Sequence, residues 1–297
     1  MLAGFPIPDF DFDDDQLVPI AMPVPTLRPE TISDDYILLC DEFNIQITNH
    51  IPIRCTGNSV VFIGKSDLSD QECALKFSRH KNRISEEYQK RLNLPDSPYL
   101  VKSVNIYESS NCSMLQMELC EDGDLSGKTF PEAVLWQLIH DIGVALEIIH
   151  STGWIHLDIS PSNILSDGNR FKLADFGTLL QKDSFQPGCE GAGPYVSPET
   201  MLFPEEPVGP PTDIFSFGIV LLELASGFYA PRGGEERYGK LRRGEIKLGD
   251  EKYTCDASPD LINFINSMMS PDQNLRPTAF DLSHHPLGIQ AAAYEDE

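Results

Sequence analysis

The sequence has few basic residues and no long apolar run. Lysine and arginine number 22 against 46 aspartates and glutamates, which gives a formal net charge of −24. A surface of this sign disfavours nucleic acid and anionic membranes as partners. The apolar run at 219–222 ends at Glu223, far short of the roughly 20 residues that a membrane-spanning helix needs. We therefore expect neither a nucleic-acid partner nor a membrane segment.

Paired cysteines are also lacking. The seven cysteines include no Cys-x-x-Cys pair and no zinc-like cluster, a pattern typical of a reducing, intracellular compartment. No basic region precedes an apolar stretch near residue 1, so no secretory signal is expected. We predict an intracellular protein of the nucleus, the cytoplasm or both.

The chain of 297 residues is long enough for one large domain with a sizeable core. Residues 1–42 are rich in proline and acidic residues, and such a segment buries too little to offset its ordering entropy. We therefore predict a disordered tail over 1–42, a domain over 43–288, and a loose C-terminal tail over 289–297.

Three polar side chains follow one another in the order that phosphoryl transfer uses. Asp158 stands in the run His-Leu-Asp-Ile-Ser-Pro-Ser-Asn, Asn163 ends that run, and Asp175 opens a later Asp-Phe-Gly. In protein kinases the first carboxylate orients the acceptor hydroxyl, while the amide and the second carboxylate hold Mg²⁺ on the triphosphate of ATP. Each short motif alone is weak, but their order, spacing and apolar context agree. We predict a protein kinase with Asp158 as a catalytic residue and Asn163 and Asp175 as metal ligands.

The segment before these motifs alternates between apolar and polar residues, as antiparallel strands do. Lys76 ends an Ala-Leu-Lys triplet, the form in which a kinase presents the lysine that holds the α- and β-phosphates. Glu86 and Glu87 follow in a predicted helix, and we favour Glu87 as the partner of Lys76. The expected fold is α+β and two-lobed: a small antiparallel β-sheet N-lobe at about 43–119 and a mainly helical C-lobe at about 120–288.

The loop that should cover the nucleotide lacks its glycines. A Gly-x-Gly-x-x-Gly-x-Val loop lets backbone amides approach the phosphates. Aligning Val61 with the final valine places Arg54, Thr56 and Ser59 at the glycine positions, and Gly57 is out of register. We therefore expect a looser phosphate clamp. The residues predicted to contact ATP are Ile53, Gly57, Val61, Ala74, Lys76, Met117, Glu118, Cys120 and Leu165, with Met117 gating the pocket and the backbones of Glu118 and Cys120 facing adenine.

Two positions of the catalytic loop depart from many kinases. Leu157 stands where an arginine often receives an activation-loop phosphate, so we expect no activation by phosphorylation of the loop at Thr178, Ser184 or Tyr195. Ser160 replaces a lysine that stabilises the transferring phosphoryl group, and its hydroxyl donates a hydrogen bond but supplies no charge. We assign Ser160 to the catalytic set and expect slower transfer.

Two further acidic residues are predicted to anchor the second lobe. Glu199, in Ser-Pro-Glu, closes the activation segment, and Arg276 is its expected buried partner. Asp213 begins a long apolar helix and is expected to hold the backbone of the catalytic loop.

Several segments resemble the Wee and Myt kinase family, which phosphorylates and inhibits cyclin-dependent kinases. Residues 156–163 are similar to its His-Met/Leu-Asp-Ile-Lys-Pro-Ser-Asn, and residues 116–120 to its Gln-Asn-Glu-Tyr-Cys hinge. Glu190-Gly191 resembles the start of its Glu-Gly-Asp-Ser-Arg-Phe/Tyr. Residues 230–234 and 241–244 resemble its Leu-Pro-Arg-Asn-Gly and Ile-Arg-Gln-Gly. The resemblance covers about residues 47–286, and it departs at the loop glycines, at Ser160 and at Met117.

The resemblance implies a kinase that transfers the ATP γ-phosphate to a tyrosine of a cyclin-dependent kinase bound to cyclin, with the adjacent threonine as a second target. We expect the kinase itself to be a monomer. Such an enzyme would restrain cell-cycle progression. Two alternatives stay open: a pseudokinase scaffold with weak or no catalysis, supported by the degraded loop and Ser160, and a serine/threonine kinase with other substrates.

Overall fold

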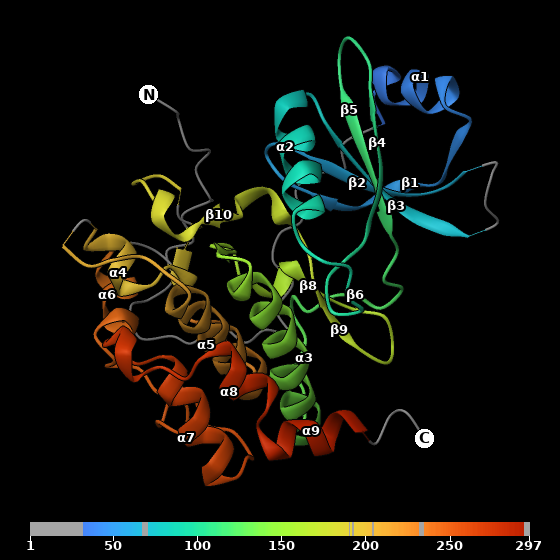
Figure 1. Cartoon of the computed structure of the whole chain (residues 1–297). Coiled ribbons are helices and arrows are strands. Elements are labelled where there is room, and N and C mark those ends of the chain that lie inside the picture. Colours follow the sequence, from blue (N-terminus) through green and yellow to red (C-terminus); the bar gives the residue numbers. More distant parts are fainter. Residues whose placement is uncertain are drawn as a thin grey trace. The chain divides into compact units, whose positions relative to one another are not determined.

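The structure, a computed structural model, describes residues 32–66, 71–189, 191, 193–203, 205–231 and 235–293, without the side chains of 235–237. The described residues form two compact units (Figure 1). The sheet unit comprises residues up to Glu121 together with Asp175–Gly177, and the helical unit comprises Asp122–Ala174 and the described residues from Thr178 onward. The predicted α+β class is confirmed.

The sheet unit is built on a five-stranded antiparallel sheet with the order β1-β2-β3-β5-β4. Its strands are β1 (Ile45–Cys55), β2 (Val60–Ser66), β3 (Glu72–Ser78), β4 (Ser103–Glu108) and β5 (Ser113–Glu118), and helix α2 (Lys81–Leu92) lies between β3 and β4 in the chain. The alternating apolar residues between 45 and 55 form one strand, β1. Irregular pairing with β2 between Ile47 and Arg54 explains the broken alternation in the sequence.

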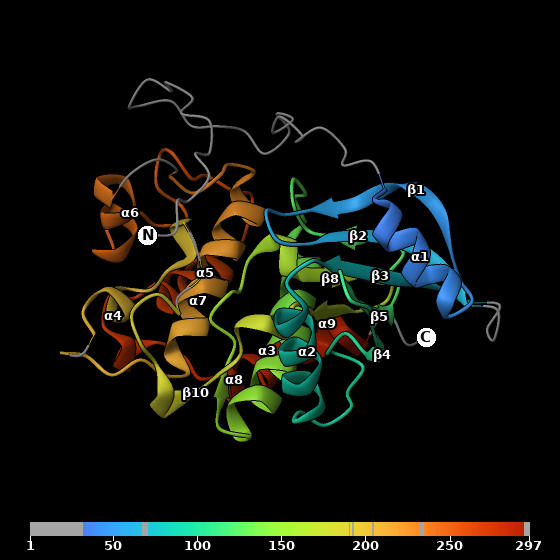
Figure 2. The same ribbon diagram turned by 90° about the horizontal axis from the view of Figure 1, so that it is seen from above.

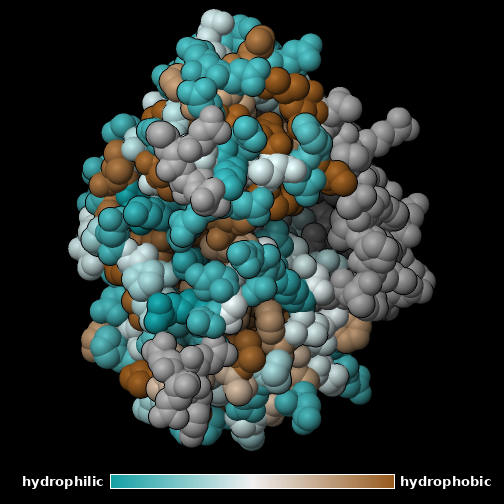
Figure 3. Space-filling model, turned by 90° about the vertical axis from the view of Figure 1, so that its right-hand side faces the viewer, coloured by the Kyte–Doolittle hydropathy of each residue, from teal (hydrophilic) through white to brown (hydrophobic). Residues whose placement is uncertain are grey.

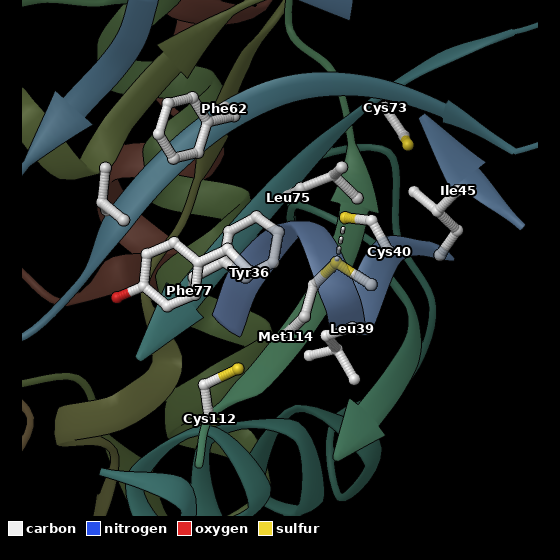
Figure 4. Close-up of a cluster of buried hydrophobic side chains, with 11 residues drawn as sticks. Tyr36, Leu39, Cys40, Ile45, Phe62, Cys73, Leu75, Phe77, Cys112 and Met114 are labelled. Atoms are coloured by element: carbon white, nitrogen blue, oxygen red, sulfur yellow. Dashed lines mark hydrogen bonds between the residues drawn. The ribbon is translucent and has the colours of Figure 1, made fainter. Parts of the chain in front are cut away.

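A helix outside the predicted domain completes the core of the sheet unit. Helix α1 (Asp34–Glu42) packs Tyr36, Leu39 and Cys40 against the sheet (Figures 2 and 4). The ring of Tyr36 stacks on that of Phe77 with centroids 4.7 Å apart, and the Cys40 Sγ lies 4.0 Å from the Met114 Sδ. The prediction of disorder is therefore wrong for 34–42, because three apolar residues at helical spacing are enough when a sheet face receives them. Residues 1–31 lie outside the described residues.

Exposed apolar side chains of the sheet unit include Leu38, Ile51 and Ile53. On the face shown in Figure 3, apolar residues lie interspersed among polar ones. Single exposed apolar residues are ordinary on protein surfaces, so these carry no functional argument by themselves.

The helical unit contains most of the helices. Its helices are α3 (Glu132–Ser151), α4 (Pro198–Met201), α5 (Pro211–Ser226), α6 (Glu235–Arg242), α7 (Pro259–Met268), α8 (Ala279–Ser283) and α9 (Pro286–Ala293). Its short strands are β6 (Gly123–Asp124), β7 (Trp154–Ile155), β8 (Ile164–Ser166), β9 (Phe171–Leu173) and β10 (Leu180–Gln181), which form the sheets β6-β8-β9 and β10-β7. Helix α9 corrects the predicted loose tail for residues 289–293, and residues 294–297 lie outside the described residues.

Helices α3 and α5 form the core of the helical unit. Helix α5 begins at Pro211, whose missing amide is no loss in a first turn, and ends before Gly227, which adopts the left-handed φ of 76° that a helix end favours. Helix α3 is long and apolar enough to span a membrane by length and composition, but most of it is buried within the structure. Core helices meet the same test, so this is weak evidence for a membrane span.

A buried ion pair joins Glu199 of α4 to Arg276. The Arg276 guanidinium donates to both carboxylate oxygens at 2.7 and 2.9 Å, and both side chains are fully buried. Thr212 adds a hydrogen bond to Glu199 at 2.9 Å. Burial alone would raise the pKa of Glu199, but the hydrogen bonds and charge of Arg276 outweigh it and hold the pKa below its ordinary value. The predicted pair is confirmed.

We expect Glu199→Gln to lower the free energy of unfolding by about 3–5 kcal/mol, because the substitution leaves the Arg276 cation buried without its counter-charge. Denaturant unfolding followed by circular dichroism measures this loss. Glu205, an exposed residue, provides the control: Glu205→Gln should change the free energy by no more than about 0.5 kcal/mol. Equal effects of the two substitutions would contradict the prediction.

The ion pair of Glu199 with Arg276 should also make the free energy of unfolding depend on pH. Because the folded pKa of Glu199 lies below its ordinary value of 4.5, ionised Glu199 stabilises the fold above the unfolded pKa, and this contribution is lost as the pH falls through the folded pKa. The stability difference between the wild type and Glu199→Gln should therefore be constant near neutrality and shrink below about pH 4.5. Unfolding curves measured over this range test the sign, and a difference that grows toward acid pH would refute it.

Candidate active site

Lys76 lies on the face of the sheet opposite the core. Its neighbours on β3, Leu75 and Phe77, are fully buried, and because side chains alternate along a strand, Lys76 projects from the other face. The pairing places Val61 opposite Lys76, and Met117 opposite Ala74. Directly paired residues share a face, so four of the predicted nucleotide contacts, namely Val61, Ala74, Lys76 and Met117, lie on one side of the sheet.

The Lys76 amine is held between two carboxylates. Its Nζ lies 2.8 Å from the Glu87 Oε2 and 3.1 Å from the Asp175 Oδ1. Glu87 is buried on α2, whereas Glu86 is exposed. The predicted pairing of Lys76 with Glu87 is therefore present, and Asp175 joins it.

The charge of Lys76 is stabilised by this arrangement. Burial alone would lower the pKa of Lys76, but the attraction of Glu87 and Asp175 is larger and raises the pKa above its ordinary value. The amine is thus a fixed cation at neutral pH, as a group that binds phosphate oxygens must be.

The hairpin between β1 and β2 is closed by its own side chains. The Thr56 hydroxyl accepts from the amides of Asn58 and Ser59 at 3.4 and 3.1 Å, and the Thr56 amide donates to the Ser59 carbonyl at 2.8 Å. A Cβ added to Gly57 would meet nothing within 4 Å, so this glycine is not required by close packing. Three loop amides are already used within the turn, which agrees with the expected loose phosphate clamp. Ile53 is half exposed on β1.

The hinge candidates Glu118 and Cys120 lie at the end of β5 and just after it. The Glu118 amide donates to the Lys102 carbonyl at 3.0 Å, and the Glu118 carboxylate accepts from the Lys102 amide at 2.7 Å. Cys120 is buried in the sheet unit, and Leu165 lies on β8 of the helical unit, where it pairs with Lys172.

Asp213 holds the catalytic loop by its backbone. This fully buried carboxylate accepts from the amides of His156 and Leu157 at 2.8 and 2.9 Å, and it bonds the His150 ring at 2.9 Å. Burial alone would raise the pKa of Asp213, but these hydrogen bonds and the two histidines lower it. Leu157 adopts a φ of 67°, which an L-residue takes up only when its surroundings require it. The predicted anchoring role of Asp213 is confirmed.

Asp158 is oriented by Asn163. The Asn163 Nδ2 donates to the Asp158 Oδ2 and to the Asp158 carbonyl, both at 2.8 Å. His156 is fully buried, and its Nε2 contacts the Ala174 carbonyl at 3.1 Å. Gly191 approaches the loop closely, because a Cβ there would lie 2.6 Å from the Leu157 carbonyl and 3.0 Å from the Asp158 Oδ1.

Ser160 and Leu157, the two positions of the catalytic loop that depart from many kinases, make different kinds of contact. The Ser160 hydroxyl lies 3.0 Å from that of Ser162. Both side chains are neutral, so no charge stands at position 160. Leu157 is buried in an apolar cluster with Ile155, Phe185 and Val208, and Leu180, Cys189 and Phe203 pack against it. An apolar contact thus occupies the place where many kinases have a cation.

The predicted metal ligands belong to different units: Asn163 lies in the helical unit and Asp175 in the sheet unit. Carboxylate and amide oxygens are the donors that Mg²⁺ prefers, so these residue types fit the ion. Sequence reasoning missed Lys90 and Arg91 of α2, which contact the residues after Asp175. Neither residue carried a motif by which it could have been found.

Comparison with known proteins agrees with this geometry. The protein kinase domain model matches residues 56–287. The chain is 29% identical over 245 residues to the membrane-associated tyrosine- and threonine-specific cdc2-inhibitory kinase wee-1.3 of Caenorhabditis elegans, covering 79% of this chain and 34% of the relative. It is 33% identical over 194 residues to the membrane-associated tyrosine- and threonine-specific cdc2-inhibitory kinase of Drosophila melanogaster, covering 63% and 35%.

A third relative is the mitosis inhibitor protein kinase mik1 of Schizosaccharomyces pombe, at 31% identity over 237 residues, 72% of this chain and 40% of the relative. The chain therefore spans between a third and two-fifths of the length of these relatives. A protein kinase domain implies the use of ATP and a divalent metal in general. The match covers most of the sequence and includes both clusters of site residues, and the chain belongs to the protein kinase family, with relatives of the Wee1, Mik1 and Myt1 type.

Proposed function

We propose that this protein is a Wee-like kinase that uses Mg²⁺ and transfers the γ-phosphate of ATP to a tyrosine of a cyclin-dependent kinase bound to cyclin, with the adjacent threonine as a second target. The printed functions of the relatives support the substrate. The observation that carries the catalytic part is the pair of intact clusters, Lys76–Glu87–Asp175 and Asp158–Asn163. The proposed setting is a monomer in the nucleus, the cytoplasm or both.

Each residue has a defined task in this proposal. Lys76, held by Glu87, binds the α- and β-phosphates, while Val61, Ala74 and Met117 line one side of the nucleotide. Asn163 and Asp175 would hold Mg²⁺, which would supply positive charge to the phosphates. Asp158 orients the acceptor hydroxyl and its carboxylate accepts the hydroxyl proton. The acceptor oxygen bonds the γ-phosphorus, the bond from that phosphorus to the bridging oxygen breaks, and ADP leaves.

Two observations favour the scaffold alternative. The hairpin amides at Thr56, Asn58 and Ser59 are bonded within the turn, and Ser160 supplies no charge where many kinases have a lysine. Both features weaken phosphate binding and leave the Lys76 and Asp158 clusters intact. We therefore expect slow transfer rather than none. A transfer assay with site mapping distinguishes a slow Wee-like kinase from a serine/threonine kinase with other substrates.

A transfer assay with Mg-ATP and a catalytically dead cyclin-dependent kinase bound to cyclin tests the proposal. We expect phosphate on the tyrosine of its phosphate loop, mapped by mass spectrometry, and a loss of at least about 100-fold in rate for Asp158→Asn, because the acceptor is no longer oriented. Glu251→Gln, on an exposed residue of the helical unit, is the control and should keep the wild-type rate.

The other outcomes of that assay are also decisive. Phosphate on serine or threonine of unrelated proteins alone would favour the second alternative. No transfer, despite thermal stabilisation by nucleotide, would favour the scaffold. Ser160→Lys would then be the variant to test, since a restored cation should recover transfer if charge at this position is what is missing.

The activation segment should not require phosphorylation. The Thr178 hydroxyl donates to the His156 carbonyl at 2.9 Å, the Tyr195 hydroxyl donates to buried Glu223 at 2.9 Å, and Leu157 packs in its apolar cluster. Phosphate at Tyr195 would face a carboxylate. We expect phosphatase-treated protein to keep its rate within about twofold. A large rise on phosphorylation of Thr178, Ser184 or Tyr195 would contradict this.

A further inference from the structure

A short stretch of the sheet unit gathers positive charge, although the whole chain has a formal net charge of −24. Residues 79–83 contain Arg79, His80, Lys81 and Arg83 and no acidic residue. The stretch runs from the end of β3 into the first turn of α2. Arg79, His80 and Arg83 are exposed, and Lys81 is partly exposed. The side chains of Arg79, Lys81 and Arg83 are called the basic surface below.

The cations of the basic surface lack carboxylate partners. Within the part of the chain that the structure describes, none of these three side chains forms an ion pair. Other cations of the sheet unit differ, because Lys76 pairs with Glu87 and Arg91 pairs with Asp96. Like charges held close together repel one another, so an anionic group placed over them is favoured. The basic surface is therefore complementary to an acidic segment.

The beginning of α1 lies beside the basic surface. The Asp35 carboxylate accepts from the Asn111 side chain at 2.9 Å, and the Asp35 carbonyl accepts from the Cys112 thiol at 3.5 Å. Burial raises the pKa of the Cys112 thiol, the charge of Asp35 raises it further, and the charges of Lys81 and Arg79 act in the opposite direction. The first turn of α1 and two cations of the basic surface therefore lie around one side chain.

The sequence that precedes α1 carries the opposite charge. Residues 9–15, which lie outside the described residues, read Asp-Phe-Asp-Phe-Asp-Asp-Asp. Residues 16–31 connect this acidic segment to Ile32, and at 3.3–3.6 Å per residue they can span up to about 50 Å. Such a tether gives an effective concentration on the order of millimolar, so even a contact with weak intrinsic affinity forms within the chain.

We propose that the acidic segment 9–15 docks on the basic surface of the same chain. Its carboxylates pair with the two guanidinium groups, which accept carboxylates in a bidentate manner, and with the lysine amine. Because α2 also carries Glu87, the partner of Lys76, docking connects the N-terminal segment to the helix that holds this lysine. The proposal does not depend on phosphoryl transfer.

Cross-linking of the full chain with a zero-length carbodiimide tests the docking. The reagent joins a carboxylate to an amine in contact with it, so we expect an amide bond between Lys81 and an aspartate of 9–15, mapped by mass spectrometry. A mixture of ¹⁵N-labelled and unlabelled protein separates bonds within one chain from bonds between chains. Lys240 and Lys247, exposed lysines of the helical unit, are internal controls and should be joined to 9–15 at least about fivefold less. High salt should lower the yield at Lys81, because exposed charges are screened.

A fluorescent peptide of residues 5–16 measures the affinity of the same contact. It is added to the full chain with Asp→Asn at each aspartate of the acidic segment, and the wild type should bind it more weakly because its own segment competes. In the Asp→Asn background, Arg79→Gln with Arg83→Gln should weaken binding by at least about threefold. Lys240→Gln with Lys247→Gln, the matched control pair, should leave it unchanged.

Three outcomes would overturn the proposal. The first is the absence of a bond between Lys81 and residues 9–15, and the second is a bond found only between different chains, which would indicate association of two copies. The third is an equal loss of peptide affinity in both glutamine pairs, which would indicate attraction to any cation. All substituted residues are exposed, and circular dichroism verifies that each variant folds.

Discussion

The rest of the sheet unit depends on the ion pairs that the buried Lys76 amine makes with the carboxylates of Glu87 and Asp175. A cation taken out of water has to be paired closely, and a carboxylate on each side raises its pKa despite burial. The pairing fixes three elements at once: strand β3, helix α2 and the segment after β9. Lys90 and Arg91 extend the same contact from Asp175 to Gly177.

A second buried carboxylate has the corresponding role in the helical unit. Asp213 accepts the backbone amides of His156 and Leu157 and so fixes the loop that carries Asp158. Because its backbone is held by Asp213, Leu157 can place its side chain in an apolar cluster with Phe185 of the activation segment. The activation segment is held by this packing and by the buried pair of Glu199 with Arg276, which is why we expect it to need no added phosphate for order.

Much of this was accessible from the sequence. The Ala-Leu-Lys triplet identified Lys76, Glu87 was favoured as its partner, and motif spacing identified Asp158, Asn163 and Asp175. The ion pairs of Lys76 and Arg276 were predicted with the correct partners. Helix α1 was missed because proline and acid dominate residues 1–42, so an average over that segment hides Tyr36, Leu39 and Cys40. Helix α9 was missed because its sequence has weak amphipathic character.

The sequence by itself determined the fold class, the family and the residue types of the site, because each follows from local periodicity or from motifs of fixed spacing. Only the tertiary structure decided which residues support the site. Whether Arg91 faces water or an aromatic ring, and whether Thr56 leaves loop amides open or bonds them, depends on neighbours that no pattern specifies. Burial and hydrogen bonding depend on contacts between segments that are distant in the sequence, and local sequence patterns do not specify those contacts.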